Sequence, residues 1–304
     1  MRLQILGCWA AAPNSKHRTT SQVLEVNGHL LLLDCAEATQ ITLRQHRIKF
    51  TRIHHIFISH LHGDHVLGLV GLIMTFRMLN RAKPLHIYGP KGIKNFVCSQ
   101  LKSLSAYTDY PLIFKELERN APEVIFEDNK LKVTTIPLKH RIYANGYLFE
   151  EAPKDRKLLL SKVLNYNIDK AYFNSIKKGK DILLDSGVCI KNEELTEAPP
   201  PPKRYAFCTD TAYYPPIAEQ LKKIGTIDVL YHEATFLNSH EHLCIPTGHS
   251  TAQQAGKIAK AAAVKQLILG HYSTRYGHLQ AFIDESQIEF ENTHLAIDGK
   301  VFEW

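Results

Sequence analysis

Short apolar runs separated by polar segments recur along the whole chain, and their lengths and spacing predict an α/β protein. Two runs, at 23–26 and 29–33, are joined by Asn27-Gly28, which favours a two-residue hairpin turn because both positions tolerate positive φ angles. Other runs of strand length lie at 2–7, 53–58, 85–90, 132–140, 205–209, 227–231 and 266–270. The pattern therefore predicts many short strands with helices between several of them.

Three segments in the first third of the chain have helical spacing. Residues 38–46 have apolar positions at helical spacing, and a helix is also expected at 93–104. Residues 66–79 are almost all apolar, which predicts a helix buried either in the core or in a contact between subunits.

A fourth helix is expected at 251–263 in the last third of the chain. Ser250 and Gln253 have the spacing of a capping box, so we expect them to begin this helix. His249 comes directly before it, at a place where backbone N–H groups favour an anion such as phosphate.

Polar residues with metal-binding or acid–base chemistry follow several of the expected strands. His60, His140, Asp210, Glu233 and His271 each stand at the carboxyl end of one. In α/β folds, the loops at strand carboxyl ends assemble sites from distant parts of the sequence. One such residue alone would most often be structural, but five predict a common site.

The densest cluster is Ser59-His60-Leu61-His62-Gly63-Asp64-His65, directly before the apolar helix. Imidazole nitrogens and carboxylate oxygens are ligands that Zn²⁺ prefers. Ligands this close together in the sequence cannot all serve one tetrahedral ion. The cluster therefore predicts a two-metal site. The alternative is a polar turn whose histidines are only solvated.

Composition narrows the class of protein. The chain has 304 residues and a formal net charge of +7, which favours a polyanionic partner without establishing one. Its six cysteines include no C-x-x-C pair, which favours a reducing cytoplasm. No run approaches the roughly 18 apolar residues of a membrane span. No repeat or second core is visible, so we expect a single domain over 1–304.

Residues 150–180 differ in composition from the rest of the chain. They hold eight Lys or Arg against four acids, with Tyr166, Tyr172 and Phe173 among them. Basic and aromatic residues together suit phosphate contacts and base stacking, so we expect an inserted arm at about 150–182 that contacts nucleic acid. The alternative is an amphipathic segment that docks on the body of the protein.

At this point the motifs resemble a known family. The H-x-H-x-D-H cluster, with the later His, Asp and His, is similar to that of the metallo-β-lactamase superfamily. Within it, further motifs resemble those of the ribonuclease Z family. They are Pro13…Lys16-x-Arg18, Thr209-Asp210-Thr211, His232-Glu233-Ala234-Thr235-Phe236, Gly248-His249-Ser250-Thr251 and His271-x-Ser273-x-Arg275-Tyr276.

The resemblance implies a fold and a set of metal ligands. The fold would be an αββα sandwich, two mixed β-sheets flanked by helices, with the basic arm protruding. Two Zn²⁺ ions per chain would be bound, with Asp210 bridging them. The ligands of the first would be His60, His62 and His140, and those of the second Asp64, His65 and His271.

The implied activity is that of a zinc-dependent endoribonuclease. It would remove the 3′ trailer of precursor tRNA, leaving a 3′-hydroxyl on the tRNA and a 5′-phosphate on the trailer. Asp64 would also accept the proton of the attacking water, and His249, oriented by Glu233, would protonate the leaving oxygen. Candidate substrate-binding residues are Lys16, Arg18, Ser273 and Arg275, with Lys177 and Lys178 from the arm. The resemblance further implies a cytoplasmic homodimer with no membrane contact.

Two other functions fit parts of the sequence. One is a phosphodiesterase or esterase of the same superfamily that acts on a small substrate. The other is an RNA-binding protein with a decayed site, which the complete ligand set argues against.

The sequence departs from the family pattern in two places. Residues 168–173 lack the Gly-Pro turn usual in the family's long arm, so that turn must be built differently. The early loop has one extra residue between Pro13 and Lys16, and Thr19 in place of the usual Asn. Neither departure affects an implied metal ligand.

Overall fold

The fold is described from a computed structural model that covers residues 1–184 and 187–304. It divides into two compact units, one formed by Met1–Glu150 with Lys203–Trp304, the other by Glu151–Pro202. The arm expected at about 150–182 thus corresponds to most of the second unit, which continues through the four prolines at 199–202.

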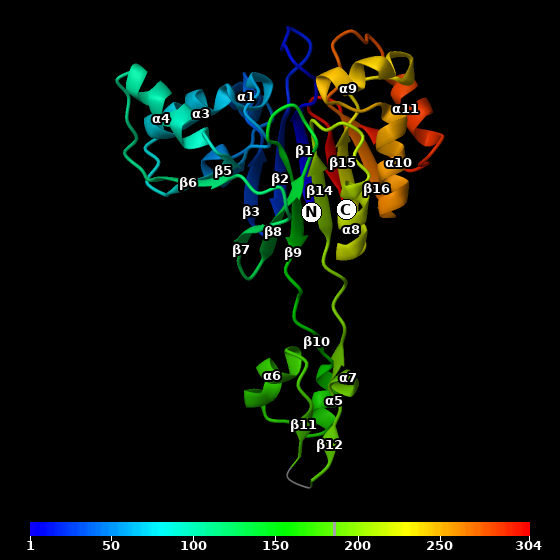
Figure 1. The fold of residues 1–304 in the computed structure, drawn as a ribbon. Coiled ribbons are helices and arrows are strands. Elements are labelled where there is room, and N and C mark those ends of the chain that lie inside the picture. Colours follow the sequence, from blue (N-terminus) through cyan, green and yellow to red (C-terminus); the bar gives the residue numbers. More distant parts are fainter. Residues whose placement is uncertain (185–186) are drawn as a thin grey trace. The chain divides into compact units, whose positions relative to one another are not determined.

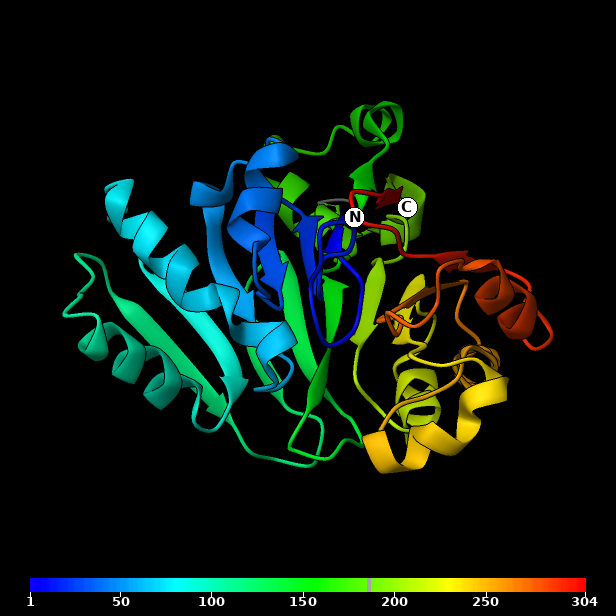
Figure 2. The same cartoon turned by 90° about the horizontal axis from the view of Figure 1, so that it is seen from above.

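The first unit contains two seven-stranded sheets, each covered on its outer face by helices (Figures 1 and 2). The first sheet has the order β18 (Val301–Glu303), β1 (Arg2–Gly7), β2 (Ser21–Val26), β3 (His29–Leu33), β4 (Ile53–Phe57), β5 (Leu85–Pro90), β6 (Leu112–Leu117). The second has the order β17 (Thr293–Leu295), β16 (Gln266–Gly270), β15 (Val229–Glu233), β14 (Arg204–Cys208), β9 (Asn145–Glu151), β8 (Leu131–Pro137), β7 (Val124–Glu127). The predicted sandwich of two mixed sheets between helices is confirmed.

Helices accompany each sheet. Those of the first half are α1 (Thr39–Gln45), η1 (Phe50–Arg52), α2 (Gly63–Val66), α3 (Gly68–Met78) and α4 (Ile93–Ser103). Those of the second half are α8 (Pro216–Ile224), η3 (Asn238–Leu243), α9 (Cys244–Thr247), α10 (Ala252–Ala262) and α11 (Gln280–Gln287). None of the helices in the described part of the chain combines the length and apolar character that crossing a membrane requires.

The strand directions bring distant segments to one edge. Strands β3 to β6 run parallel to one another, as do β14 to β17. Parallel neighbours end at the same edge of a sheet, so the loops after them lie close together. Strand β14 also pairs antiparallel with β9, with Arg204 opposite Glu150, so the second unit is inserted between two adjacent strands.

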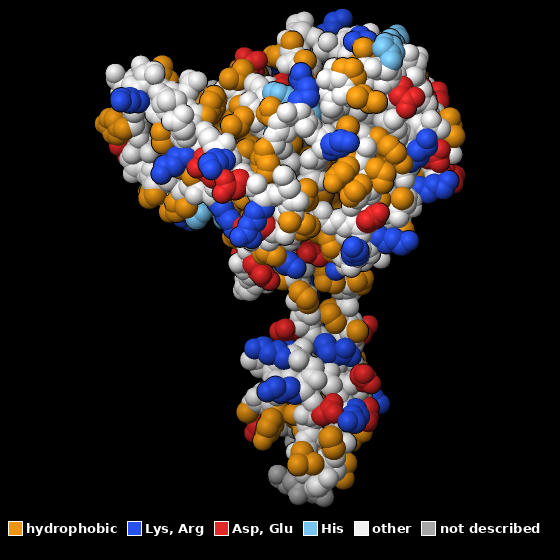
Figure 3. Space-filling model, in the orientation of Figure 1, with side chains coloured by type: hydrophobic (Ala, Val, Ile, Leu, Met, Phe, Trp, Pro, Cys, Tyr) orange, Lys and Arg blue, Asp and Glu red, His pale blue; other side chains and the backbone are white. Residues whose placement is uncertain are grey.

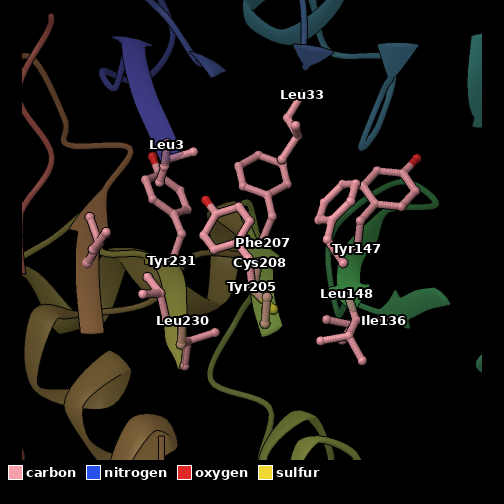
Figure 4. Close-up of a cluster of buried hydrophobic side chains, with 14 of the residues drawn as sticks. Leu3, Leu33, Ile136, Tyr147, Leu148, Tyr205, Phe207, Cys208, Leu230 and Tyr231 are labelled. Carbon is pink, nitrogen blue, oxygen red and sulfur yellow. The ribbon is translucent and has the colours of Figure 1, made fainter. Parts of the chain in front are cut away.

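The core between the sheets is made by their inward-facing side chains. Leu3 and Leu33 of the first sheet face Tyr147, Phe207 and Tyr231 of the second, and all are fully or almost fully buried (Figure 4). A second cluster fills the space between the first sheet and its helices, with Leu69, Leu72, Ile73 and Phe76 of α3. The apolar helix expected at 66–79 is therefore a core helix, although α2 and α3 meet at Leu67 instead of forming one helix.

The hairpin prediction is confirmed, because Asn27 and Gly28 have φ angles of 47° and 88°. The predicted capping box is wrong by one residue. Thr251 caps α10, and Gln254 completes the box. The Ser250 hydroxyl instead donates a hydrogen bond to the Thr211 carbonyl at 2.6 Å, so it is not available to the helix.

The second unit is small but has apolar residues buried within itself. It contains β10 (Lys157–Leu158) paired with β13 (Thr196–Glu197), β11 (Ile182–Leu183) paired with β12 (Cys189–Ile190), α5 (Leu160–Asn165), η2 (Lys170–Tyr172), α6 (Phe173–Lys177) and α7 (Asn192–Leu195). Val163, Ile176 and Leu195 are fully buried in its own cluster. In the stretch without the family's Gly-Pro turn, Asp169 caps η2 by accepting a hydrogen bond from the Ala171 N–H.

Candidate metal centre

Potential metal ligands from both sheets lie together at the carboxyl edge of the parallel strands. One group is His60, His62, His140 and Asp210, and another is Asp64, His65 and His271. Within each group the ligand atoms lie within 4.8 Å of one another. The structure therefore brings together all seven residues that the sequence suggested as ligands.

The aspartate between the two groups presents one oxygen to each. Asp210 Oδ1 lies 3.2 Å from His65 Nε2 and 3.2 Å from His271 Nε2. Its Oδ2 lies 3.5 Å from His60 Nε2, in the other group. One carboxylate therefore contacts both groups of potential ligands.

Histidine nitrogens within each group face one another. His62 Nδ1 lies 3.0 Å from His60 Nε2 and 3.2 Å from His140 Nε2. Burial lowers the pKa of all three side chains, so they stay neutral near pH 7 and keep a lone pair for a metal. In the other group, His65 Nε2 lies 3.3 Å from His271 Nε2.

In four of the five histidines, the ring nitrogen that points away from the other ligands contacts another polar group. His140 Nδ1 donates to the Gly248 carbonyl at 2.8 Å, which leaves its Nε2 unprotonated and directed at the cluster. His271 Nδ1 lies 2.9 Å from the Thr235 hydroxyl, and His60 Nδ1 lies 3.0 Å from the Ser59 hydroxyl. Metal-binding histidines are usually oriented in this way, so the donor set and its support fit bound metal.

Asp34 is a buried carboxylate next to a potential ligand, and the sequence analysis did not include it among the site residues. It is fully buried, and its Oδ2 lies 2.7 Å from His65 Nδ1. It also accepts hydrogen bonds from the backbone N–H and the hydroxyl of Ser59, at 2.7 and 2.8 Å. Its place directly after β3, like that of the other strand-end residues, is the signal that could have identified it.

A carboxylate and a histidine form a pair next to the ligand groups. Glu233 is fully buried, and its Oε1 accepts from His249 Nδ1 at 2.8 Å and from the Ser250 N–H at 3.1 Å. Its Oε2 accepts from the Thr235 N–H and hydroxyl, both at 2.8 Å. The carboxylate of Glu233 thus takes the place that the sequence analysis expected for an anion next to the N-terminus of α10.

These contacts set the charge of both partners. Burial alone would lower the pKa of His249, but the charge and hydrogen bond of Glu233, with the charge of Asp210, raise it to about 9. Burial would raise the pKa of Glu233, but the charge of His249 outweighs it and lowers that pKa. At neutral pH the pair is therefore a protonated imidazole and a carboxylate.

A cleft of about 410 Å³ opens over the ligand groups. Asp64, Asp210, His249 and His271 line it, together with Ser273. The Ala11 N–H donates to Asp64 Oδ2 at 2.8 Å, which ties the early loop to a ligand.

The suggested substrate-binding residues lie in three places. Ser273 lines the cleft and accepts a hydrogen bond from Arg275 Nε at 3.2 Å. Lys16 and Arg18 belong to the early loop, where the Arg18 N–H donates to Asp298 Oδ2 at 2.8 Å. Lys177 and Lys178 are not among the cleft residues; they are exposed at the end of α6 in the second unit.

The chain is similar to known proteins over nearly its whole length. Ribonuclease Z of Bacteroides fragilis is 42% identical over 97% of this chain and 96% of its own length. Ribonuclease Z of Porphyromonas gingivalis is 40% identical over 96% of this chain and 95% of its own length. The crystal structure of human tRNase Z, short form, superposes with a TM-score of 0.72 at 25% identity, covering 100% of this chain and 99% of that one.

Two family models match parts of the chain. The beta-lactamase superfamily domain matches residues 198–272, and the anti-Pycsar protein Apyc1 matches residues 1–144. The relatives above match nearly the whole length, and the ligand groups are those of a metal-dependent hydrolase. The chain belongs to the ribonuclease Z family of the metallo-β-lactamase superfamily.

Proposed function

We propose that this protein is an endoribonuclease that removes the 3′ trailer from precursor tRNA. The observation that carries the proposal is the His249–Glu233 pair beside two groups of metal ligands in one cleft. A phosphodiester hydrolase needs to activate water and to protonate the leaving oxygen, and this cleft holds residues for both. The identity to ribonuclease Z relatives supports RNA as the substrate.

Two Zn²⁺ ions are the metals that we propose for the site. His60, His62 and His140 would hold one, Asp64, His65 and His271 the other, with Asp210 between them. When bound, such ions lower the pKa of water to near 7 and stabilise the negative charge of the phosphoryl group.

Asp64 and His249 have the proposed proton-transfer roles. Asp64 accepts the proton of the attacking water, and the Ala11 N–H holds its Oδ2 in place. His249 gives its proton to the departing 3′ oxygen. Because its Nδ1 is engaged by Glu233, the Nε2–H is the one free to donate. The products are a tRNA with a 3′-hydroxyl and a trailer with a 5′-phosphate.

The second unit is the proposed tRNA-binding arm. Lys and Arg side chains are spread over its visible face, with apolar and acidic side chains between them (Figure 3). Tyr172 is 53% exposed and could stack on a base, and Lys177 and Lys178 are exposed. Lys16, Arg18, Ser273 and Arg275 complete the proposed RNA contacts.

A cytoplasmic homodimer is also part of the proposal. The buried face of α3 packs in the core, so it is not the dimer surface. Met78, the last residue of that helix, and Leu67 and Leu79, which flank it, are exposed and remain available for a contact.

The cleavage position on a precursor tRNA with a 3′ trailer tests the function directly. The zinc-loaded protein should cut directly after the discriminator base, and His62→Ala, which removes a ligand, should abolish the cut. His46→Ala, which changes an exposed histidine outside the ligand groups, should cut normally. An intact precursor after incubation with protein carrying two zinc ions per chain would disprove the proposal.

Asp34→Asn should weaken zinc binding by about 10- to 100-fold, because the carboxylate orients His65 and increases its basicity. Competition with a chelator measures the affinity. Asp128→Asn is the matched control, because Asp128 Oδ2 makes a similar 2.9 Å contact with His29 outside the ligand groups. Equal affinities in the two variants would contradict the role of Asp34.

Glu233→Gln should move the alkaline limit of activity to lower pH. The proton donor must be protonated, so activity should fall as the pH rises through the pKa of His249, about 9. Without the charge of Glu233, burial dominates and that pKa falls. The pH profile of kcat/KM on precursor tRNA measures the shift, and an unchanged alkaline limb in the variant would exclude the proposed pair.

The contribution of the arm can be measured with two pairs of neighbouring lysines. Lys177→Ala with Lys178→Ala should raise KM for precursor tRNA. The slope of log KM against the logarithm of the salt concentration should also decrease, by about 0.7 for each phosphate that the variant no longer neutralises. Lys222→Ala with Lys223→Ala, an exposed pair at the end of α8, is the control and should change neither quantity. Equal effects of the two pairs would mean that only net charge matters.

A further inference from the structure

Arg141 lies in the cleft and has no role in the reaction described so far. It directly follows His140, in the loop between β8 and β9, and lines the cleft with His62, Asp64 and His249. Its side chain is exposed. Within 1–184 and 187–304, no carboxylate lies within ion-pair distance of its guanidinium, whereas Arg77 and Arg204 each have such a partner.

The backbone of Arg141 is held firmly against the proton donor's loop. A Cβ added at Gly248 would lie 2.9 Å from His140 Nδ1, 3.3 Å from Arg141 N and 3.5 Å from Arg141 Cγ. Glycine, with a φ of +73°, therefore permits this close approach. The loop is also fixed to the segment after β14, since the Ala212 N–H donates to the Lys139 carbonyl at 2.8 Å.

An arginine whose backbone is held in place and whose guanidinium has no ion-pair partner among the described residues is suited to bind a phosphate. Guanidinium groups bind phosphate oxygens with two parallel hydrogen bonds, and an unpaired one does not have to break an ion pair first. In the proposed function, the scissile phosphate binds between the metal-ligand groups and His249. An arginine on the wall of the same cleft is placed for the next phosphate along the strand.

We propose that Arg141 is a substrate-binding residue that contacts a phosphate adjacent to the scissile one. The inference rests on the proposed function, because a small diester with a single phosphate has no neighbouring phosphate to bind. Arg141 then helps to select a polynucleotide over a small phosphodiester, at the cleft itself and separately from the arm.

The first measurement compares two substrates. For Arg141→Ala, the ratio of kcat/KM on precursor tRNA to that on bis(p-nitrophenyl) phosphate should fall by about 10- to 100-fold, the range for one charged hydrogen-bonded contact. Arg141→Lys, which keeps the charge but not the paired hydrogen bonds, should lie in between. Lys102→Ala, an exposed lysine on α4 that does not line the cleft, is the charge-matched control and should leave the ratio unchanged. Activity on the small diester also reports that each variant is folded.

The second measurement locates the contact with precursors that carry one neutral methylphosphonate linkage beside the cleavage site. At one position, the neutral linkage should slow the wild-type protein but have little further effect on Arg141→Ala, because both changes remove the same interaction. Independent effects at every position, or equal reductions on the precursor and the small diester, would overturn the inference. A wild-type protein that does not cut the precursor overturns the proposed function and this inference with it, whereas normal cutting by Arg141→Ala overturns this inference alone.

Discussion

Seven imidazole and carboxylate groups crowd together at one edge of the sandwich, and His60, His65, Asp210 and His271 are almost completely shielded from water. Polar groups in such a place are costly unless each has a partner. The surrounding residues supply these partners on the outer side, through Asp34, Ser59, Thr235 and the Gly248 carbonyl. Bound cations would complete them on the inner side, which couples the stability of this edge to metal binding.

The apolar core reaches up to this edge and fixes its geometry. Gly270, the last residue of β16, lies so close to the Tyr231 ring that an added Cβ would overlap its hydroxyl. His271 follows with a φ of 60°, and Asp34 and Ala11 have similar left-handed backbones at 54° and 66°. Such conformations cost roughly 1–2 kcal/mol each outside glycine and persist where the surroundings enforce them. All three residues contact the ligand groups or belong to them: His271 is a potential ligand, Asp34 contacts His65, and the Ala11 N–H donates to Asp64.

Much of this site could be predicted because its signals are local in the sequence. The His60 to His65 cluster is contiguous, and Asp210, Glu233 and His271 each follow an apolar run that is recognisable as a strand. The cap of α10 lies one residue after the expected position. Ser250 bonds to Thr211 instead, a contact across 39 positions that no local pattern contains.

Other features depended on pairings that the sequence does not display. Strands β10 and β13 have two residues each, too short for a recognisable period, so the extent of the second unit was not apparent. Asp34 was visible as the end of a strand, but its contact with His65 depends on β3 and β4 lying side by side. The position of Arg141 against Gly248 likewise exists only in the folded chain.

The insertion of the second unit between paired residues has a consequence for how this family can diversify. Glu150 and Arg204 lie opposite each other on neighbouring strands and are joined by a 2.8 Å ion pair. The pairing of β9 with β14 therefore continues up to the point where the second unit is inserted. For the sheet, the whole unit is equivalent to a long hairpin loop, and such loops tolerate changes in length and sequence without loss of register. Selection can therefore change the inserted unit while the two sheets and the ligand groups at their edge stay the same.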